Sequence, residues 1–588
     1  QSKADHDKLK GVGILAGRTE GNLNDITVEV KKEDHVILHV SMEGSHNALG
    51  IGGLVGVLAD EERGQLGAVK KAEISNICVS GVIRATLPEI TVTGDVEDAA
   101  AEYVYGIGGV VGYAYMDSSA KKSEAVITDC ENHSNIYGNY FTGGIIGNVH
   151  GNDSSGGTED IAERANVRTN SNDGLIQCTA DAKDTSLCGH YFGGIAGYAD
   201  QVLIYKGSSA SGRAGGFSYN ETKKDQLKGQ YVGGIIGYGQ STILSSCSTK
   251  KNGYILGDKY VGGIAGGFRG AIRADGEVQV TTNASYVIGN SYVGGIVGKN
   301  IENVTIENCV NYGTVYGYQS HYSGGIVGQW TNNGGTVEDC YNYGNLQTTY
   351  ETGWVGASGG IVAQMYHAAS GQDFNIISCQ NHGSVFGRDG ASYYHWENSR
   401  KVKDCANDSA GILGNVTVYT TYDINAAQKF TINVSDCVNA PGVKIYSSSM
   451  ASGIVGYFST DTASSKNGGP IGTSTANIVL NIDRCRNYAE TLVGGNNYIA
   501  GIFGDRYKDG TVAQDNTYIQ NCYSVIGSDA GTSTGIVSLN NASLSSSLSG
   551  DKVGNNYYFF DTWGLTNTAG RIFDSSNTRN ESRKGFSR

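Results

Sequence analysis

The chain has 588 residues and a formal net charge of −14, and no Lys/Arg run extends over five residues, which disfavours a nucleic-acid or anionic-membrane partner. No apolar stretch approaches the roughly 18 residues that cross a bilayer, so no membrane insertion is expected. Glycine contributes 87 residues and proline only 3, without a collagen-type period, and this composition favours ladders of strands joined by tight turns.

One short phrase recurs along most of the chain: a small residue, Gly, an aliphatic residue, a second apolar residue and usually another Gly. Its clearest copies lie at 194–197, 234–237, 263–266, 295–298 and 325–328. About 14 copies at a period below about 50 residues predict a stack of equivalent units. Short apolar strands with Gly at the bends then predict an all-β fold, a right-handed parallel β-helix (β-solenoid) of about 14 coils over residues 1–540.

A second recurring element, Cys-x-Asn, lies upstream of the phrase. Its copies are Cys130/Asn132, Cys309/Asn311, Cys340/Asn342, Cys379/Asn381, Cys405/Asn407, Cys437/Asn439 and Cys485/Asn487. The interval from a Cys to the Gly of the phrase is 16 residues in five coils, those that begin at Cys178, Cys247, Cys309, Cys437 and Cys485. The two elements are therefore expected to hold fixed places on each coil.

Most of the 12 cysteines follow an apolar-rich strand, about one per coil, which predicts an inward, unbridged ladder of small hydrophobic side chains. Only Cys188 and Cys405 are placed outside this ladder. Because an even cysteine count in a secreted chain usually means bridges, Cys178–Cys188 is the one pair left open as a disulfide. Each Asn shares the strand parity of its Cys and is predicted to form a second, structural ladder at a corner.

The phrase at 292–298, followed by Cys-x-Asn-x-Gly-x-Val-x-Gly at 309–317, resembles the GLUG repeat, and the resemblance covers about residues 11–540. Such repeats are found in large bacterial surface adhesins. They also precede the catalytic domain of secreted zinc peptidases of the immunoglobulin A protease type. The resemblance implies a bacterial surface β-solenoid and does not imply one activity.

Catalytic motifs find little support. None of the 11 histidines belongs to His-Glu-x-x-His, the zinc motif of such peptidases. The serine phrases at 356–360 and 531–535 coincide with the repeat, and no motif places a partner His or Asp. No catalytic residue, metal site or cofactor is therefore predicted. Acidic residues before the ladder cysteines, such as Asp129 and Asp339, are interpreted as a solvated outer stripe; calcium is the ion they would suit, but no calcium-loop motif is present.

Aromatic residues gather in neighbouring coils whose connecting arms carry extra residues. The predicted ligand-binding residues are Trp330, Tyr350, Trp354, Tyr366, His367, Tyr393, Tyr394, His395 and Trp396. Aromatic side chains on loops either fill local hydrophobic gaps or offer a stacking platform for sugars or a partner protein. The platform is the hypothesis, and the hydrophobic plug is its alternative.

The Tyr-rich segment 541–573 departs from the repeat and is predicted to cap the open end of the stack, and 574–588 is interpreted as a tail or linker. The chain begins at Gln1 without a Met or a signal peptide, which predicts a piece of a larger secreted or cell-surface protein.

The leading interpretation is a non-catalytic bacterial β-solenoid whose projecting loops bind a host protein, such as an immunoglobulin, or a glycan. The first alternative is the substrate-binding region of a secreted immunoglobulin-cleaving metallopeptidase whose catalytic domain is absent here. The second is a polysaccharide lyase or glycoside hydrolase of the β-helix type.

Overall fold

A computed structural model describes most of the chain between residues 9 and 560. The described residues are 9–30, 35–41, 48–62, 65–92, 96, 102–117, 124–152, 166–181, 183, 186–205, 209–210, 214–215, 227–273, 280–318, 322–331, 334–349, 356–367, 372–387, 394–397, 400–403, 407–419, 430–447, 450–461, 478–494, 498–508, 517–526, 553–554 and 557–560. Every element among them is a strand. Within this described part, no helix has the length and apolarity needed to cross a membrane.

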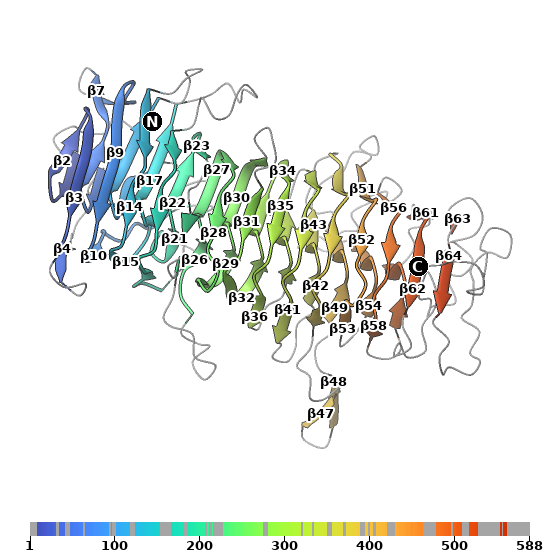
Figure 1. Ribbon diagram of the computed structural model, residues 1–588. Coiled ribbons are helices and arrows are strands. Elements are labelled where there is room, and N and C mark those ends of the chain that lie inside the picture. Colours follow the sequence, from blue (N-terminus) through green and yellow to red (C-terminus); the bar gives the residue numbers. More distant parts are fainter. Residues whose placement is uncertain are drawn as a thin grey trace, which may run out of the picture. The chain divides into compact units, whose positions relative to one another are not determined.

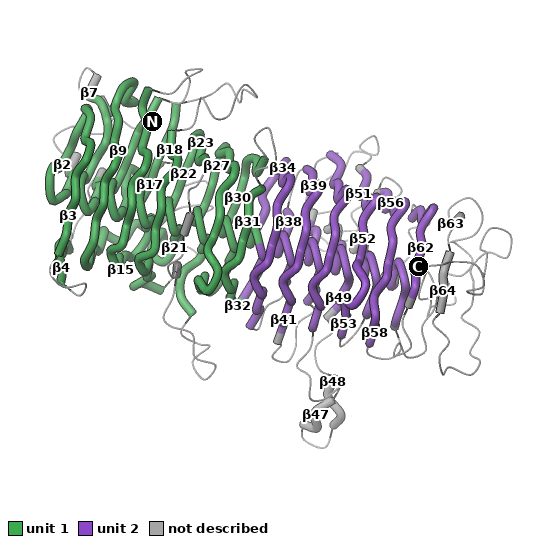
Figure 2. Tube along the Cα trace, viewed as in Figure 1, with its two compact units in different colours: residues 1–290, 296–298 green, residues 291–295, 299–588 purple. Residues whose placement is uncertain are grey.

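The chain divides into two compact units, residues 1–290 with 296–298 (unit 1) and residues 291–295 with 299–588 (unit 2) (Figure 2). Both units are built from coils of short strands, and each strand pairs in parallel with the equivalent strand one coil later (Figure 1). Residues of both units occur in β32 (Tyr286–Gly294) and β33 (Val297–Ile301). The predicted all-β, parallel solenoid architecture is confirmed within each unit.

The strands of unit 2 form five columns with one strand per coil. The column after the Gly phrase contains β38 (Val327–Thr331), β43 (Val362–His367), β50 (Leu413–Tyr419), β55 (Val455–Asp461) and β60 (Phe503–Lys508). The column before the Cys contains β34 (Val304–Glu307), β39 (Gly335–Glu338), β44 (Phe374–Ile377), β51 (Phe430–Ser435), β56 (Ile478–Asp483), β61 (Thr517–Gln520) and β63 (Val553–Gly554). The column with the Asn contains β35 (Cys309–Asn311), β40 (Tyr341–Asn342), β45 (Gln380–Asn381), β52 (Val438–Asn439), β57 (Arg486–Asn487), β62 (Tyr523–Ile526) and β64 (Tyr557–Phe560). The fourth column contains β36 (Val315–Tyr318), β41 (Leu346–Thr349), β46 (Val385–Gly387), β53 (Lys444–Ser447) and β58 (Thr491–Val493). The column before the next phrase contains β37 (Tyr322–Gly324), β42 (Gly356–Gly359), β49 (Asn407–Ala410), β54 (Met450–Ser452) and β59 (Tyr498–Ala500).

Unit 1 repeats these columns, and some of its strands are long enough to belong to two of them. After the phrase lie β2 (Ala16–Thr19), β6 (Val55–Leu58), β12 (Val111–Met116), β17 (Ile146–Gly151), β22 (Ala196–Asp200), β27 (Ile236–Ser245) and β30 (Ala265–Arg273). The next two columns contain β3 (Leu23–Val28), β9 (Ala72–Val79), β13 (Ala125–Thr128), β14 (Glu131–Asn132), β18 (Val167–Arg168), β19 (Ser171–Asn172), β23 (Leu203–Tyr205), β24 (Ser209–Ala210), β28 (Ser248–Thr249) and β31 (Thr281–Asn283). The return to the phrase runs through β4 (Val36–Ser41), β10 (Val82–Thr86), β15 (Asn135–Gly138), β20 (Ile176–Cys178), β25 (Ala214–Gly215) and β29 (Tyr254–Gly262), then β1 (Leu9–Gly13), β5 (Ala48–Gly52), β11 (Val104–Gly108), β16 (Thr142–Gly143), β21 (His190–Gly193) and β26 (Gln230–Gly233).

Two antiparallel hairpins stand apart from these columns. They are β7 (Asp60–Glu62) with β8 (Gln65–Gly67), and β47 (Tyr394–Glu397) with β48 (Arg400–Lys403). Beyond residue 540, the described strands β63 and β64 continue the parallel pairing of β61 and β62. The tail predicted at 574–588 lies outside the described residues.

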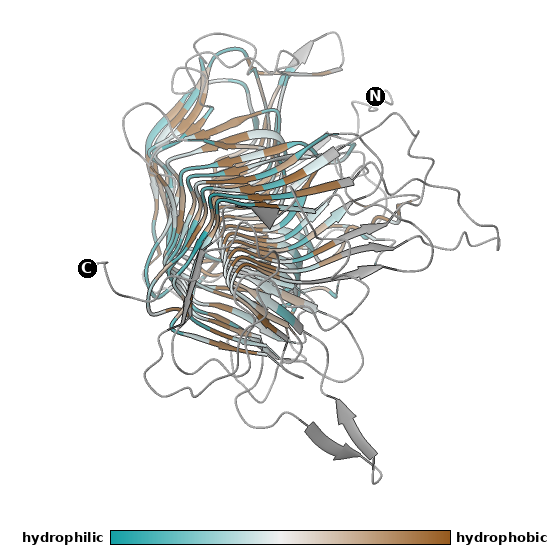
Figure 3. Ribbon diagram, turned by 90° about the vertical axis from the view of Figure 1, so that its right-hand side faces the viewer, coloured by the Kyte–Doolittle hydropathy of each residue, from teal (hydrophilic) through white to brown (hydrophobic). Residues whose placement is uncertain are grey.

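The core of each coil is formed by the aliphatic residues of the phrase and by alternate residues of the strands. In unit 2, Ile326, Ile361 and Ile412 are fully buried at equivalent places in successive coils. Apolar segments recur along the strands of the coils (Figure 3). Since each coil covers the apolar surface of its neighbours, stability depends on contacts between adjacent coils.

The Gly phrase marks a bend that leaves no room for a side chain. A Cβ on Gly359 would lie 1.8 Å from the carbonyl oxygen of Val362, and a Cβ on Gly360 would lie 2.0 Å from that of Gly411 and 2.3 Å from Cγ of Asn381. The strands on either side of the bend, and the asparagine corner inside it, are therefore packed against bare backbone. This close approach explains why the phrase keeps its glycines.

Candidate functional site

A ladder of six buried thiols runs through unit 2, with one residue in each successive coil. Its members are Cys309, Cys340, Cys379, Cys437, Cys485 and Cys522, and the register of the adjoining strands places them level with one another. The Sγ of Cys379 donates to the carbonyl oxygens of Ile377 at 3.3 Å and of Val337, in the preceding coil, at 3.5 Å. Burial raises the pKa of Cys340 and of Cys437, so these thiols stay protonated and act as small core residues.

The predicted ladder needs correction in unit 1, where Cys78 and Cys178 lie off it. Cys78 pairs with Glu131, the residue after Cys130, so Ile77 takes the ladder position in that coil. Cys178 belongs to β20 and pairs with Gly138, which places it on the next strand of the coil. Its interval of 16 residues to the phrase is therefore a coincidence of loop lengths.

No disulfide forms among the described cysteines. Cys178 and Cys188, the pair left open by the sequence, both carry free thiols, as do the other described members. Cys405 lies outside the described residues.

We expect thiol alkylation of the native protein to separate these classes. Cys78 and Cys188 are half-buried, whereas Cys130 and the six unit 2 thiols are buried, and burial raises the pKa of Cys130 to about 12. Since the thiolate is the reactive form, Cys78 and Cys188 should be modified well before the ladder members. Site-resolved peptide mass spectrometry checks this, with guanidinium-unfolded protein as the control. Rapid native labelling of Cys379 or Cys437 would contradict the buried ladder.

The predicted asparagine ladder is confirmed and is structural. In unit 2 each amide nitrogen donates to the oxygen of the next amide: 2.8 Å from Asn311 to Asn342, 2.9 Å from Asn342 to Asn381 and 3.0 Å from Asn381 to Asn439. The same nitrogen also donates to the carbonyl oxygen two residues on, as from Asn381 to Gly383 at 2.9 Å. These buried amides are hydrogen-bonded to the turn and to one another, and none of them faces solvent.

The residue before each ladder Cys lies on the outer side of the coil, as predicted. Asp129, Asp339 and Asp436 all have left-handed backbone, with φ of 53°, 49° and 56°, and are exposed or half-buried. This stripe is not uniformly acidic, because the same position holds Asn308, Ser378, Arg484 and Asn521 in other coils.

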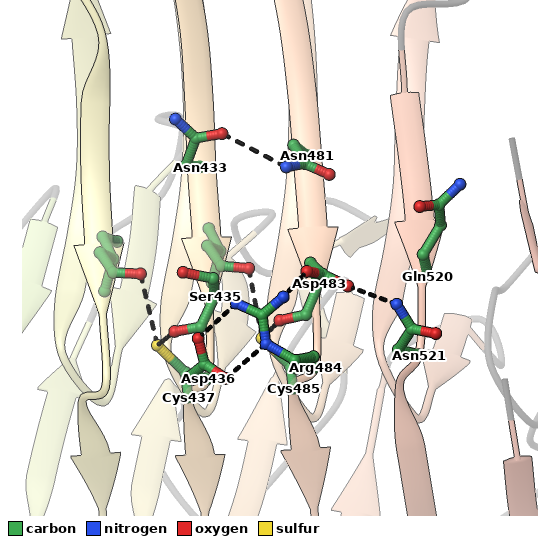
Figure 4. Close-up of polar contacts among 12 residues, drawn as sticks. Asn433, Ser435, Asp436, Cys437, Asn481, Asp483, Arg484, Cys485, Gln520 and Asn521 are labelled. Atoms are coloured by element: carbon green, nitrogen blue, oxygen red, sulfur yellow. Dashed lines mark hydrogen bonds and ion pairs between the residues drawn. The ribbon is translucent and has the colours of Figure 1, made fainter. Parts of the chain in front are cut away.

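Arg484 joins two neighbouring coils (Figure 4). Its Nε and one terminal nitrogen lie 2.7 Å from the two carboxylate oxygens of Asp436, and its other terminal nitrogen contacts Asp483. This guanidinium lowers the pKa of Asp436. The ion pair is exposed and links adjacent coils, so we interpret it as part of the fold rather than as a binding site.

An exposed aromatic stack lies on the same corner of unit 2, directly after the asparagine ladder. Tyr312 and Tyr343 lie with ring centroids 5.3 Å apart and planes 12° apart, and Tyr343 stacks on His382 at 4.6 Å and 19°. Tyr312 is 57% exposed and Tyr343 is 45% exposed. Backbone N–H groups of Tyr343 and His382 donate at 2.7 Å to the carbonyls of Asn311 and Asn342, which fixes the row to the ladder.

Carboxylates and a further tyrosine precede this stack in the same coils. Asp339, Tyr341 and Tyr343 are alternate residues that leave the inward positions to Cys340 and Asn342. Burial, Asp339 and Glu307 raise the pKa of Glu338, which is in register with Glu307 on the adjacent strand. We call Tyr312, Tyr341, Tyr343, His382 and the carboxylates Glu307, Glu338 and Asp339 the corner surface.

The structure places one predicted site residue, Trp330, in the core. Its side chain is fully buried, its Nε1 donates to the carbonyl oxygen of Gly334 at 3.1 Å, and its ring meets Phe374 edge-on at 5.3 Å. Trp330 is level with Met365 in the next coil, so it fills an apolar column. It is a hydrophobic plug and cannot stack on a ligand.

The structure describes only some of the remaining predicted site residues. Tyr366 is half-buried on β43, and the backbone of His367 ends that strand. Backbone of Tyr394, His395 and Trp396 forms β47 of the separate hairpin. Tyr350, Trp354 and Tyr393, together with the side chains of His367 and of β47, lie outside the described residues.

The serine of the phrase at 356–360 is structural. Ser358 is fully buried, and its Oγ lies 3.0 Å from Oγ1 of Thr348 on the neighbouring strand. A nucleophile must reach substrate, so this serine has no such role. The second serine phrase, at 531–535, lies outside the described residues.

Sequence reasoning overlooked the corner surface, although a signal was present. Aromatic residues follow Cys-x-Asn directly in three successive coils, at Tyr312, Tyr343 and His382. The chain turns within two residues after the inward Asn. The side chain of the residue directly after the Asn therefore points to the outer side of the corner. Their recurrence at one coil position would have predicted an exposed row.

The pairing and register together define a parallel β-solenoid whose distinctive exterior feature in unit 2 is an aromatic and acidic corner. No family model, curated protein or solved structure matches the chain. The similarity to the GLUG repeat therefore rests on the repeated residues themselves and stays a prediction.

Proposed function

We propose that this chain is a non-catalytic, secreted or cell-surface β-solenoid that binds a host protein through the corner surface of unit 2. In this proposal the coil is right-handed, about 14 coils are stacked, and the segment 541–573 ends the stack. The observation that carries the proposal is the row of Tyr312, Tyr343 and His382, exposed and stacked in register.

Tyrosine side chains in such a row suit a protein partner. They offer large, amphipathic contact area with little conformational entropy to lose, and their stacking already holds the rings in place. Exposed aromatic residues that are pre-ordered in this way are typical binding hot spots.

The charges on the corner surface indicate the kind of partner. Glu307, Glu338 and Asp339 lie just before the ladder cysteines of the coils that carry Tyr312 and Tyr343, and the whole chain carries a net charge of −14. A partner patch with Arg or Lys would complement these carboxylates and could place its cations against the tyrosine rings. An immunoglobulin remains the first candidate, and a neutral glycan is the competing ligand.

The proposal is tested by measuring binding of the full chain to immunoglobulins, other extracellular host proteins and a glycan panel. We expect a protein ligand whose affinity falls with added salt, and a loss of about tenfold or more in Tyr343→Ala and Tyr312→Ala, because truncating a hot-spot aromatic costs about 2 kcal/mol. Tyr286→Ala is the matched control, since Tyr286 is also exposed and stacks on Tyr254 at 5.2 Å in unit 1.

Two results would contradict the proposal. One is a protein ligand that binds the Tyr312 and Tyr343 variants as tightly as it binds the unchanged chain. The other is binding to glycans alone. Parallel substitutions of Trp354 and Trp396 test the loop platform expected from the sequence.

A further inference from the structure

Four potential metal-binding and supporting side chains meet on the outer corner of unit 1. Strand register places Cys78 beside Glu131, and Glu131 beside Ser171, across three successive coils. His133 and Asp173 follow directly, held by backbone N–H donation to the carbonyls of Val79 at 2.8 Å and of Asn132 at 3.0 Å. The ladder that stacks the coils therefore also fixes the positions of these side chains.

Three of these side chains converge at coordination range. One ligand atom each from Cys78, Glu131 and His133 lies within 4.8 Å of the other two, and no other such group occurs among the described residues. The Nε2 of His133 is 3.4 Å from Oε2 of Glu131. Zinc bonds to nitrogen, oxygen and sulfur are about 2.0–2.3 Å long, so small side-chain rotations bring all three atoms onto one ion.

The imidazole of His133 is oriented in the way that metal ligands usually are. Its Nδ1 lies 2.5 Å from Oδ1 of Asp173. With the Nδ1 proton donated to that carboxylate, the lone pair of Nε2 points to the side where Glu131 and Cys78 lie. A carboxylate bonded to the far nitrogen fixes the tautomer and raises the basicity of metal-binding histidines.

The position of Cys78 is the feature that makes this site specific to one coil. A one-residue shift removes it from the buried ladder and leaves it half-buried on the outer side. The carboxylates of Glu131, Glu29 and Asp173 lie close enough to interact electrostatically with its sulfur. Electron-pair donors and negative charge thus accumulate there, and a cation would relieve their mutual repulsion.

We propose that Cys78, Glu131 and His133 bind one zinc-class divalent ion, with Asp173 orienting His133. The sulfur and imidazole donors favour zinc over calcium or magnesium, which prefer oxygen. Three protein ligands leave a fourth position open to water or to a ligand from solution. The site lies in unit 1 and is independent of the proposed binding role of the corner surface.

The test uses the full chain, reduced and stripped with a chelator. Calorimetric titration with Zn²⁺ should show one ion bound per chain, and Co²⁺ should produce the near-ultraviolet charge-transfer absorption of a thiolate ligand. Cys78→Ser should abolish that absorption, and Cys78→Ser and His133→Gln should each weaken Zn²⁺ binding by about tenfold or more, as should Asp173→Asn, whose effect on metal affinity is expected to be about 10–100-fold. The controls are Cys188→Ser, a half-buried thiol away from the cluster, and His382→Gln, an exposed histidine of unit 2.

Several outcomes would overturn the site. Absence of saturable Zn²⁺ binding would show that the cluster is only a group of hydrogen-bonded surface side chains. Binding that persists unchanged in Cys78→Ser and His133→Gln would place the ion elsewhere, as would equal losses in the control variants. Circular dichroism of each variant verifies that the fold is retained, since the three substituted cluster residues are exposed or half-buried.

Discussion

Replacing Gly360 with Ala is expected to destabilise the central coils of unit 2 by about 3–5 kcal/mol. The added Cβ would lie 2.0 Å from the carbonyl oxygen of Gly411 and 2.3 Å from Cγ of Asn381. One contact is with backbone and the other with a buried amide that is hydrogen-bonded on both sides, so neither can move without breaking the register of the next coil.

Hydrogen exchange is the suitable measurement, because stacked repeats can open locally rather than unfold in one step. The N–H groups of Gly325 and Gly360, which donate to Gly359 and Ala410 at 3.0 Å, should lose protection in Gly360→Ala. Gly21→Ala is the matched control, since nothing lies within 4 Å of a Cβ at that exposed position. An unchanged exchange pattern in Gly360→Ala would refute the steric explanation of the phrase.

Replacing Asn381 with Ala is expected to cost about 3 kcal/mol. The variant loses donation to Gly383 and Asn439 and removes the acceptor of Asn342, all inside a corner that water does not reach. The buried groups that were bonded to Asn381 are then left without a hydrogen-bond partner. Their uncompensated desolvation costs more free energy than the hydrogen bonds contribute net.

Asn433→Ala provides the comparison for this variant. Asn433 also belongs to a row of amides and donates to Asn375 at 2.9 Å, but it is half-buried on the outer face, where water can replace the lost bond. We expect a cost below about 1 kcal/mol there. Urea unfolding of both variants checks the difference. Equal stability losses would show that the buried corner ladder contributes no more to stability than the outer row of amides.

Much of the fold follows from strand parity and spacing. Cys and Asn two residues apart point the same way, and a phrase rich in glycine has to bend, so the two ladders and the all-β architecture could be predicted. Register within the coil was harder to predict. Cys178 and Cys309 are each 16 residues before the Gly of their phrase, yet Cys178 lies on the next strand of its coil. Differences in the lengths of two turns can cancel in the total interval, so the interval alone does not fix the strand. Cys78 shows that a single-residue shift reverses the side on which a side chain lies.

Trp330 was included in the predicted site because aromatic residues were grouped by proximity in the sequence. Trp330 is in register with Met365, and Met365 with Val416, so the equivalent positions in the following coils are apolar and indicate a core column. Tyr312, Tyr343 and His382 are dispersed in sequence but equivalent in the repeat. Alignment of the coils, rather than local clustering, distinguishes the two groups. The cluster around Cys78 depends on side-chain placement across three coils, which no spacing rule supplies.

The hydrogen bonds of the asparagine corner all run in one direction. From Asn311 to Asn487 each amide donates toward the C-terminal coil, and the last donation is accepted by the hydroxyl of Ser524 at 3.1 Å. Such head-to-tail dipoles polarise one another, so unit 2 has an electrical polarity along its stack, as a helix does along its axis. In unit 1 the row that contains Asn132 and Asn172 is short, because Val79 in the coil before it and Ala210 in the coil after it have no side-chain amide. Duplication of a unit 2 coil would extend the polarised row, whereas insertion of a coil with valine at that position would divide it in two.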